Sequence, residues 1–155
     1  MQLRAIFLIP FAAATFAGVA ATASPVKCMN GLRPALVAGG FSGSTDCKHD
    51  QLSIRYVGKV RSFGREYKIY ENRYRLQPVC RECAIHGGQR IIIMEHGRYL
   101  GQYKSDFADV AIRDGRLVIV VPNSPGSKEA TPVNFTAKGP PARHWDGSEV
   151  LLFFR

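Results

Sequence analysis

An alternating stretch from Leu52 to Val60 constrains the fold of this chain more than any other feature of its sequence. Every second residue in it is apolar or glycine, and these positions are Leu52, Ile54, Tyr56, Gly58 and Val60. Successive side chains of a β-strand point to opposite faces, so this period of two predicts a strand with one face on a core. Arg55, Lys59 and Arg61 fall at intervening positions, and on a regular strand they would share the solvent face.

The residues that follow predict a partner strand. Residues 62–65 are typical of a turn, and residues 66–76 contain tyrosines and an isoleucine, which favour strands. The alternation slips around Glu71 and Asn72, so we expect a bulge or a break at that point. Pro78 then ends the run, because proline cannot donate a hydrogen bond to a sheet.

Two further hairpins follow from short sequence signals. Residues 90–95 contain four consecutive apolar residues, which predicts a central strand covered on both faces. His96-Gly97 and Asp114-Gly115 each lie between apolar runs. Such pairs favour two-residue hairpin turns, because both central positions of these turns need a positive φ. Successive short hairpins imply an antiparallel meander.

The remaining segments complete the expected fold. Residues 122–147 contain five prolines, too many for the interior of a sheet, so we expect a long surface loop with one short strand around residues 133–136. The apolar residues 150–154 are expected to finish the sheet. Residues 34–38 suit only a short strand or turn, and no amphipathic helix is predicted after residue 23. We therefore predict an all-β fold, either a small antiparallel sandwich or a partly open barrel.

The N-terminus has the pattern of a secretory signal peptide. Arg4 precedes an apolar run over residues 5–19, and Ala21-Thr22-Ala23 provides a small-residue cleavage site. The run is shorter than the roughly 20 residues that span a membrane, so we expect no transmembrane anchor in the mature chain. Residues 1–23 are thus predicted to be removed, and the protein to be periplasmic or secreted.

The mature chain is expected to be one basic domain. A loop-rich segment over residues 24–51 precedes a β domain over residues 52–155, a total size that can bury a core. The chain has 21 basic and 12 acidic residues and a net charge of +9, and loss of Arg4 leaves +8. This charge favours association with an anionic partner. The alternative is that it serves solubility alone.

The chain has four cysteines, an even number that suits the oxidising compartment to which the signal peptide points. Four cysteines allow three pairings. We predict disulfides between Cys28 and Cys47 and between Cys80 and Cys83, because each of these closes a short loop.

Cys80 and Cys83 also form a C-x-x-C motif, which raises thiol–disulfide redox or metal binding as an alternative function. A redox dithiol needs a helix N-terminus to lower the thiol pKa, but Pro78 precedes the motif and Gly87-Gly88 follows it closely. Structural zinc commonly uses two close ligand pairs, and the other two cysteines are far apart in sequence. We therefore predict a structural disulfide, with no metal and no cofactor.

Basic and aromatic residues are dense between Arg55 and Arg90. This span has nine basic and three acidic residues, a net charge of +6. The predicted binding residues are Arg55, Lys59, Arg61, Lys68, Arg73 and Arg75. Such groups bind phosphates, carboxylates or sulfates, and the interleaved tyrosines could stack on bases or sugar rings. The alternative is that the tyrosines belong to the core and the arginine stems cover it.

The sequence contains no phosphate-binding loop, nucleophile elbow or clustered histidine motif that would indicate catalysis. We therefore predict an exported, non-enzymatic binding or structural protein of the cell envelope. Its basic face would meet an anionic envelope component or polysaccharide. Nothing predicts binding to a specific nucleic acid.

Overall fold

The computed structural model describes residues 28–47, 50–78, 80–105, 108–120, 132–145 and 150–155; the predicted signal peptide lies outside them. Two short helical segments come first, a 3₁₀ helix (Cys28–Gly31) and α1 (Arg33–Ala38). Eight strands follow, namely β1 (Gln51–Ser62), β2 (Arg65–Arg75), β3 (Gly87–Glu95), β4 (Arg98–Ser105), β5 (Asp109–Arg113), β6 (Arg116–Val120), β7 (Arg143–Trp145) and β8 (Val150–Phe154). The protein is therefore mostly β, as predicted.

The strands form one antiparallel six-stranded sheet and one separate hairpin. The sheet has the order β1-β2-β3-β4-β8-β7, and β5 pairs with β6. The first four strands are a meander, which confirms that prediction. Within the described residues the edge strands β1 and β7 do not pair with each other, so the sheet does not close.

In the described part of the chain, three two-residue turns connect β1 to β2, β3 to β4 and β5 to β6. Phe63-Gly64, His96-Gly97 and Asp114-Gly115 all have positive φ at both positions, between 48° and 77°. This backbone matches the right-handed twist of the flanking strands and so keeps them paired. The turn expected at residues 62–65 and both predicted hairpins are confirmed.

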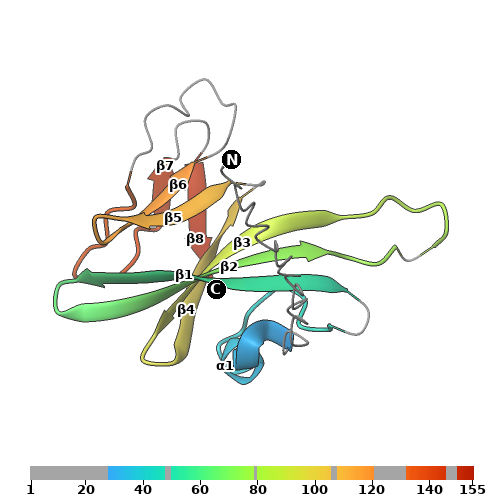
Figure 1. Ribbon diagram of the computed structural model, residues 1–155, viewed down its shortest axis with the longest axis horizontal. Helices are drawn as coiled ribbons and strands as arrows, with labels where there is room; N and C mark the ends of the chain where they lie inside the picture. The colour runs from blue at the N-terminus through green and yellow to red at the C-terminus, as the bar shows by residue number, and fades with distance from the viewer. Residues whose placement is uncertain (1–27, 48–49, 79, 106–107, 121–131, 146–149) are drawn as a thin grey trace, which may run out of the picture.

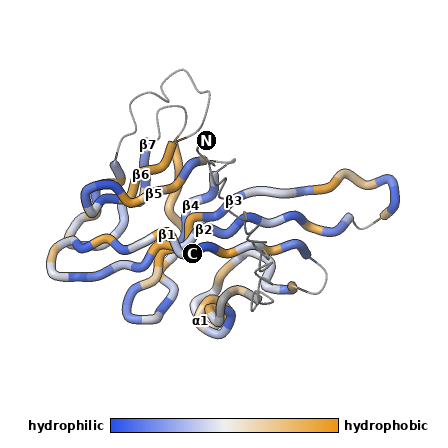
Figure 2. The backbone as a smooth tube through the Cα atoms, in the orientation of Figure 1, coloured by the Kyte–Doolittle hydropathy of each residue, from blue (hydrophilic) through white to orange (hydrophobic). Residues whose placement is uncertain are grey.

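The β5–β6 hairpin and α1 lie on opposite sides of the long strands (Figure 1). On the hairpin side, Ile69, Ile91 and Ile93 pack with Leu117 and Ile119. On the other side, the core cluster contains Leu36 of α1 with residues of β1, β3 and β4. Figure 2 shows β5 and β6 as mainly hydrophobic, in keeping with their place over the core cluster on the hairpin side of the sheet. β3 is thus covered on both faces, as its apolar run predicted.

A bulge in β1 overturns the expected single core face of that strand. The pairing of β1 with β2 shifts between Tyr56 and Gly58, so Val57 is an extra residue. A shift of one residue sends all later side chains to the other face. Ile54 accordingly packs on the α1 side, whereas Val60 packs on the hairpin side.

The bulge predicted at Glu71 and Asn72 is in the wrong strand. β2 keeps a continuous register with β3 from Tyr67 to Arg75. The slip in the sequence pattern arises because Glu71 and Asn72 are both buried. Both faces of the sheet are covered at this point, so neighbouring positions on one strand both lie inside.

Residues 34–38 are helical, contrary to the expected strand or turn. Pro34 lies in the first turn of α1, where a missing backbone N–H and a fixed φ are tolerated. Leu36 is fully buried against the sheet. Tertiary packing stabilises a six-residue helix that would not form alone.

The C-terminal segment also differs from the expected long loop. β7 lies within residues 122–147 and forms the sheet edge, so β8 joins the sheet without ending it. Near residues 133–136 the structure has isolated bridges in place of the expected strand. Val133 and Phe135 nevertheless belong to the core. Residues 121–131 and 146–149 lie outside the described part of the chain.

Candidate functional site

The bulge divides the six predicted binding residues between two faces of the β1–β2 pair. Before the bulge Arg55 pairs with Glu71, and after it Lys59 pairs with Lys68. The arginine face, on the hairpin side, carries Arg55, Arg73 and Arg75. The opposite, tyrosine face carries Lys59, Arg61 and Lys68. The expectation that Arg55, Lys59 and Arg61 share one face is therefore wrong.

Glu71 organises the arginine face. The Glu71 residue is only 3 % exposed, and its Oε2 accepts hydrogen bonds from Arg55 Nε at 2.9 Å and Nη2 at 2.5 Å. Oε1 accepts from Arg73 Nε and from Gln89 Nε2, each at 2.6 Å. One buried carboxylate thus holds two guanidinium groups side by side.

Gln89 fixes this carboxylate from inside the protein. The Gln89 side chain is fully buried, and its Nε2 also donates to the carbonyl oxygen of Ala108 at 2.7 Å. The backbone N–H of Ala108 donates back to Gln89 Oε1 at 2.6 Å. Arg55 Nη2 in addition donates to the carbonyl of Val110 at 3.3 Å. The base of the hairpin is therefore part of the support.

The charge balance at Glu71 favours an ionised carboxylate. Burial by itself raises the pKa of Glu71, but hydrogen bonds from Arg55, Arg73 and Gln89 and the charge of Arg55 outweigh it and leave the pKa lowered. With two guanidinium groups and one carboxylate the cluster carries a net charge of +1. It is consequently a cationic site at neutral pH.

The two guanidinium groups present unused donors to solvent. The side chains of Arg55 and Arg73 are 58 % and 51 % exposed. Among the described residues no hydrogen-bond partner occupies Nη1 of Arg55 or either Nη of Arg73. Together with Ser53 and Glu71 they line an open hollow of about 340 Å³. Fixed guanidinium donors of this kind suit oxyanions such as carboxylate, sulfate or phosphate.

On the tyrosine face the basic groups are less organised. Glu66 accepts from Arg61 Nε at 2.9 Å and lies 3.4 Å from Lys59 Nζ. The hydrogen bond from Arg61 is the main cause of the lowered pKa of Glu66. These side chains are exposed, and exposed ion pairs hold their partners weakly.

The tyrosines of the basic stretch leave no exposed ring on the arginine face, although Arg65 lies over the buried ring of Tyr67 at 5.2 Å. Tyr56 and Tyr70 pack together on the tyrosine face with ring centroids 5.2 Å apart. Tyr74 also points to that face, where Arg90 lies over its ring at 5.4 Å. Tyr67 points to the hairpin side but is fully buried in the core. The predicted mixture of aromatic and basic side chains therefore lies on the tyrosine face, with Lys59, Arg61 and Lys68, and not on the arginine face.

The far ends of β2 and β3 and the connection between them extend away from the hairpin, and we call this part the arm (Figure 1). The C-x-x-C motif lies in a turn at the end of the arm. Cys80 and Cys83 form a disulfide, and the N–H of Cys83 donates to the carbonyl of Cys80. No helix follows the motif, since the next regular element is β3. Cys47 is also disulfide-bonded, while the side chain of its predicted partner Cys28 lies outside those described.

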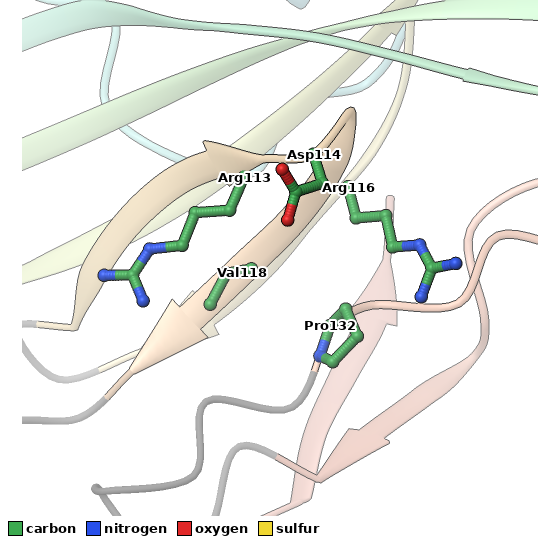
Figure 3. A pocket seen from close by; sticks show the side chains of 5 residues that line it. All are labelled: Arg113, Asp114, Arg116, Val118 and Pro132. Carbon is green, nitrogen blue, oxygen red and sulfur yellow. The ribbon is translucent and has the colours of Figure 1, made fainter.

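A second hollow lies at the β5–β6 turn. It has a volume of about 450 Å³ and is lined by Arg113, Asp114, Arg116, Val118 and Pro132. In Figure 3 the guanidinium groups of Arg113 and Arg116 point away from each other. The hollow therefore does not converge charged groups on one point, as the Glu71 cluster does. In the described segments no group of three or more potential metal ligands occurs.

Sequence reasoning missed Glu71 and Gln89 as parts of the site. Glu71 is a polar residue on a predicted strand, whereas Gln89 lies just before the strand predicted at residues 90–95. Only the pairing of β2 with β3 brings the two to one place. Comparison with protein-family models, curated protein sequences and solved structures finds no match to this chain. Within the described residues, none of the helices has the length and apolar character to cross a membrane.

Proposed function

We propose that this chain is an exported, non-enzymatic protein of the cell envelope that binds an anionic partner through its arginine face. The observation that carries the proposal is the pair of half-exposed guanidinium groups of Arg55 and Arg73, held by the buried carboxylate of Glu71. In this proposal the sheet and the β5–β6 hairpin act as the two layers of a small sandwich that supports the site.

Pre-organisation is the physical reason for choosing this face. A free arginine loses rotamer entropy when it binds a ligand, and a guanidinium already fixed by Glu71 loses less. Arg73 presents both Nη groups, which suits two-point binding of an oxyanion. The net charge of +8 that remains after loss of Arg4 would increase the rate of encounter with an anionic partner.

The alternative of redox or metal chemistry at Cys80 and Cys83 lacks comparable support. Their disulfide closes a turn with no helix N-terminus to lower a thiol pKa. We therefore assign the disulfide a structural role at the end of the arm.

Neutralising Arg55 and Arg73 tests the proposed face. The double variant Arg55→Gln, Arg73→Gln should elute from a carboxylated polysaccharide resin at clearly lower salt than the wild-type chain. The matched control is Lys59→Gln, Lys68→Gln, which removes the same charge from the tyrosine face. We expect the control to elute close to the wild type, and circular dichroism should show that both variants are folded.

Two results would contradict the proposed face. Equal shifts for both variants would mean that retention follows net charge alone. An unchanged elution of the arginine variant would show that Arg55 and Arg73 do not contact the polyanion.

Export is the second part of the proposal and has its own test. The sequence of residues 1–23 supports removal of a signal peptide. Intact-mass analysis of the protein from its native cells should give a chain that begins at Ser24 and is found outside the cytoplasm. A cytoplasmic protein that retains Met1 would contradict export without bearing on the arginine face.

A further inference from the structure

We infer that the anionic partner is an acidic polysaccharide that lies along β2, an inference that rests on the proposed function. The feature that leads to it is a third arginine, Arg75, in line with the pair at Glu71. Arg75 is exposed and lies on the same face of β2, two residues beyond Arg73.

The strand register places these arginines in successive rows. Arg55 pairs with Glu71, Ser53 pairs with Arg73 and Gln51 pairs with Arg75. Residues two apart on a strand are separated by about 7 Å, so Arg75 extends the pair held at Glu71 by one row along β2 and makes an elongated array of three arginines. One small oxyanion cannot span the array. A linear polymer with a charge on successive units can contact all of it.

The array is open along its length. Arg55 reaches the backbone of Val110, so the base of the hairpin lies beside the first row. The rows of Arg73 and Arg75 continue into the arm formed by β2 and β3 (Figure 1). Gln51, Ser53 and Gly87 are exposed around them. An extended chain therefore has a path toward the arm end.

The neighbours of the array favour a sugar chain over a nucleic acid. Binding of single-stranded nucleic acid relies on aromatic rings that stack on bases. Tyr74 lines a hollow with Arg73 and Arg75, but strand alternation sends its ring to the tyrosine face, where Arg90 lies over it at 5.4 Å and occupies the position of a stacking base. The exposed side chains beside the arginines are Gln51 and Ser53, which offer hydrogen bonds to sugar hydroxyls.

Length-defined galacturonic acid oligomers test this inference on the full chain. We expect an octasaccharide to bind at least about tenfold more tightly than a disaccharide, measured by calorimetry at constant salt. Arg75→Gln should weaken octasaccharide binding about tenfold, the loss of one good contact. For octasaccharide binding by Arg75→Gln, the slope of log affinity against log salt should be smaller by about one than for the wild type. The reason is that one fewer cationic contact releases counterions from the polyanion. Arg75→Gln should weaken disaccharide binding less than octasaccharide binding, whereas Arg55→Gln, Arg73→Gln should weaken both strongly.

The outcomes separate this inference from the proposed function. Equal affinity for the two oligomers, or an unaffected Arg75→Gln variant, would overturn the extended site while leaving the pair at Glu71 in place. Tighter binding of a single-stranded oligonucleotide of equal charge would overturn the choice of polysaccharide. If the double variant Arg55→Gln, Arg73→Gln binds every ligand with the same affinity as the wild type, the arginine face itself is not the binding site.

Discussion

Gly58→Val is expected to lower the free energy of unfolding by about 4 kcal/mol, the largest effect we predict for one substitution, by combining backbone strain with overpacking. Gly58 has a φ of +152°, which side chains rarely adopt. A Cβ atom there would lie 2.6 Å from Cγ1 of Ile112 on the hairpin. Urea unfolding followed by fluorescence measures the change.

Matched variants separate the two causes. Gly64 also has a positive φ, +73°, but nothing lies within 4 Å of an added Cβ, so Gly64→Ala should cost only about 1 kcal/mol. Gly58→Ala should lower the free energy of unfolding less in an Ile112→Ala background than in the wild-type chain, because the shortened side chain no longer clashes with the added Cβ. A Gly58→Val variant as stable as the wild type would contradict the close packing of the hairpin on the bulge.

Glu71→Gln is expected to lower the free energy of unfolding by about 2 kcal/mol at neutral pH, the usual cost of unsatisfied buried hydrogen-bonding groups. One carboxylate oxygen becomes an NH₂ group, which cannot accept from Arg55 or Arg73. The same change should weaken binding at the arginine face, because the guanidinium groups lose their support. Urea unfolding and polysaccharide-resin elution provide the two readouts.

The pH dependence provides a specific check on the role of Glu71. Because the folded state lowers the pKa of Glu71 from its ordinary 4.5, its stabilising effect is fully present above that value. It is lost as the pH falls through the folded pKa. The stability difference between wild type and Glu71→Gln should therefore be largest near neutrality and shrink as the pH falls below 4.5 toward the lowered pKa of the folded state. The exposed Glu66→Gln variant is the control, and we expect it to change little.

A stability difference that stayed constant on acidification would show that Glu71 is not ionised in the native state. In that case the cluster would carry two uncompensated guanidinium charges, and its support would have to come from neutral hydrogen bonds. A Glu71→Gln variant that kept full binding would show that the arginines do not depend on the carboxylate for their positions.

Local sequence signals predicted the β-rich fold for a clear physical reason. His96-Gly97 and Asp114-Gly115 specify their hairpins through their own backbone preferences, which need no distant contact. The consecutive apolar residues 90–95 likewise require cover on both faces wherever the chain places them. The disulfide of Cys80 with Cys83 joins residues that are close in any conformation.

The location of the candidate site depended on contacts between distant segments. α1 forms because Leu36 is buried against the sheet, a contact that its six residues do not reveal. Glu71 and Gln89 meet only through the pairing of β2 with β3, and Gln89 is fixed by Ala108 beyond β4.

By itself the sequence determined the antiparallel hairpins, the short disulfide and the concentration of charge between Arg55 and Arg90. Only the tertiary structure decided which of these basic residues act together. The extra residue Val57 turns Lys59 and Arg61 away from Arg55, and the hairpin packs directly on Gly58 at this bulge. A shift of one residue reverses a strand's two faces, and strand alternation read from sequence cannot detect a shift made by packing between distant segments.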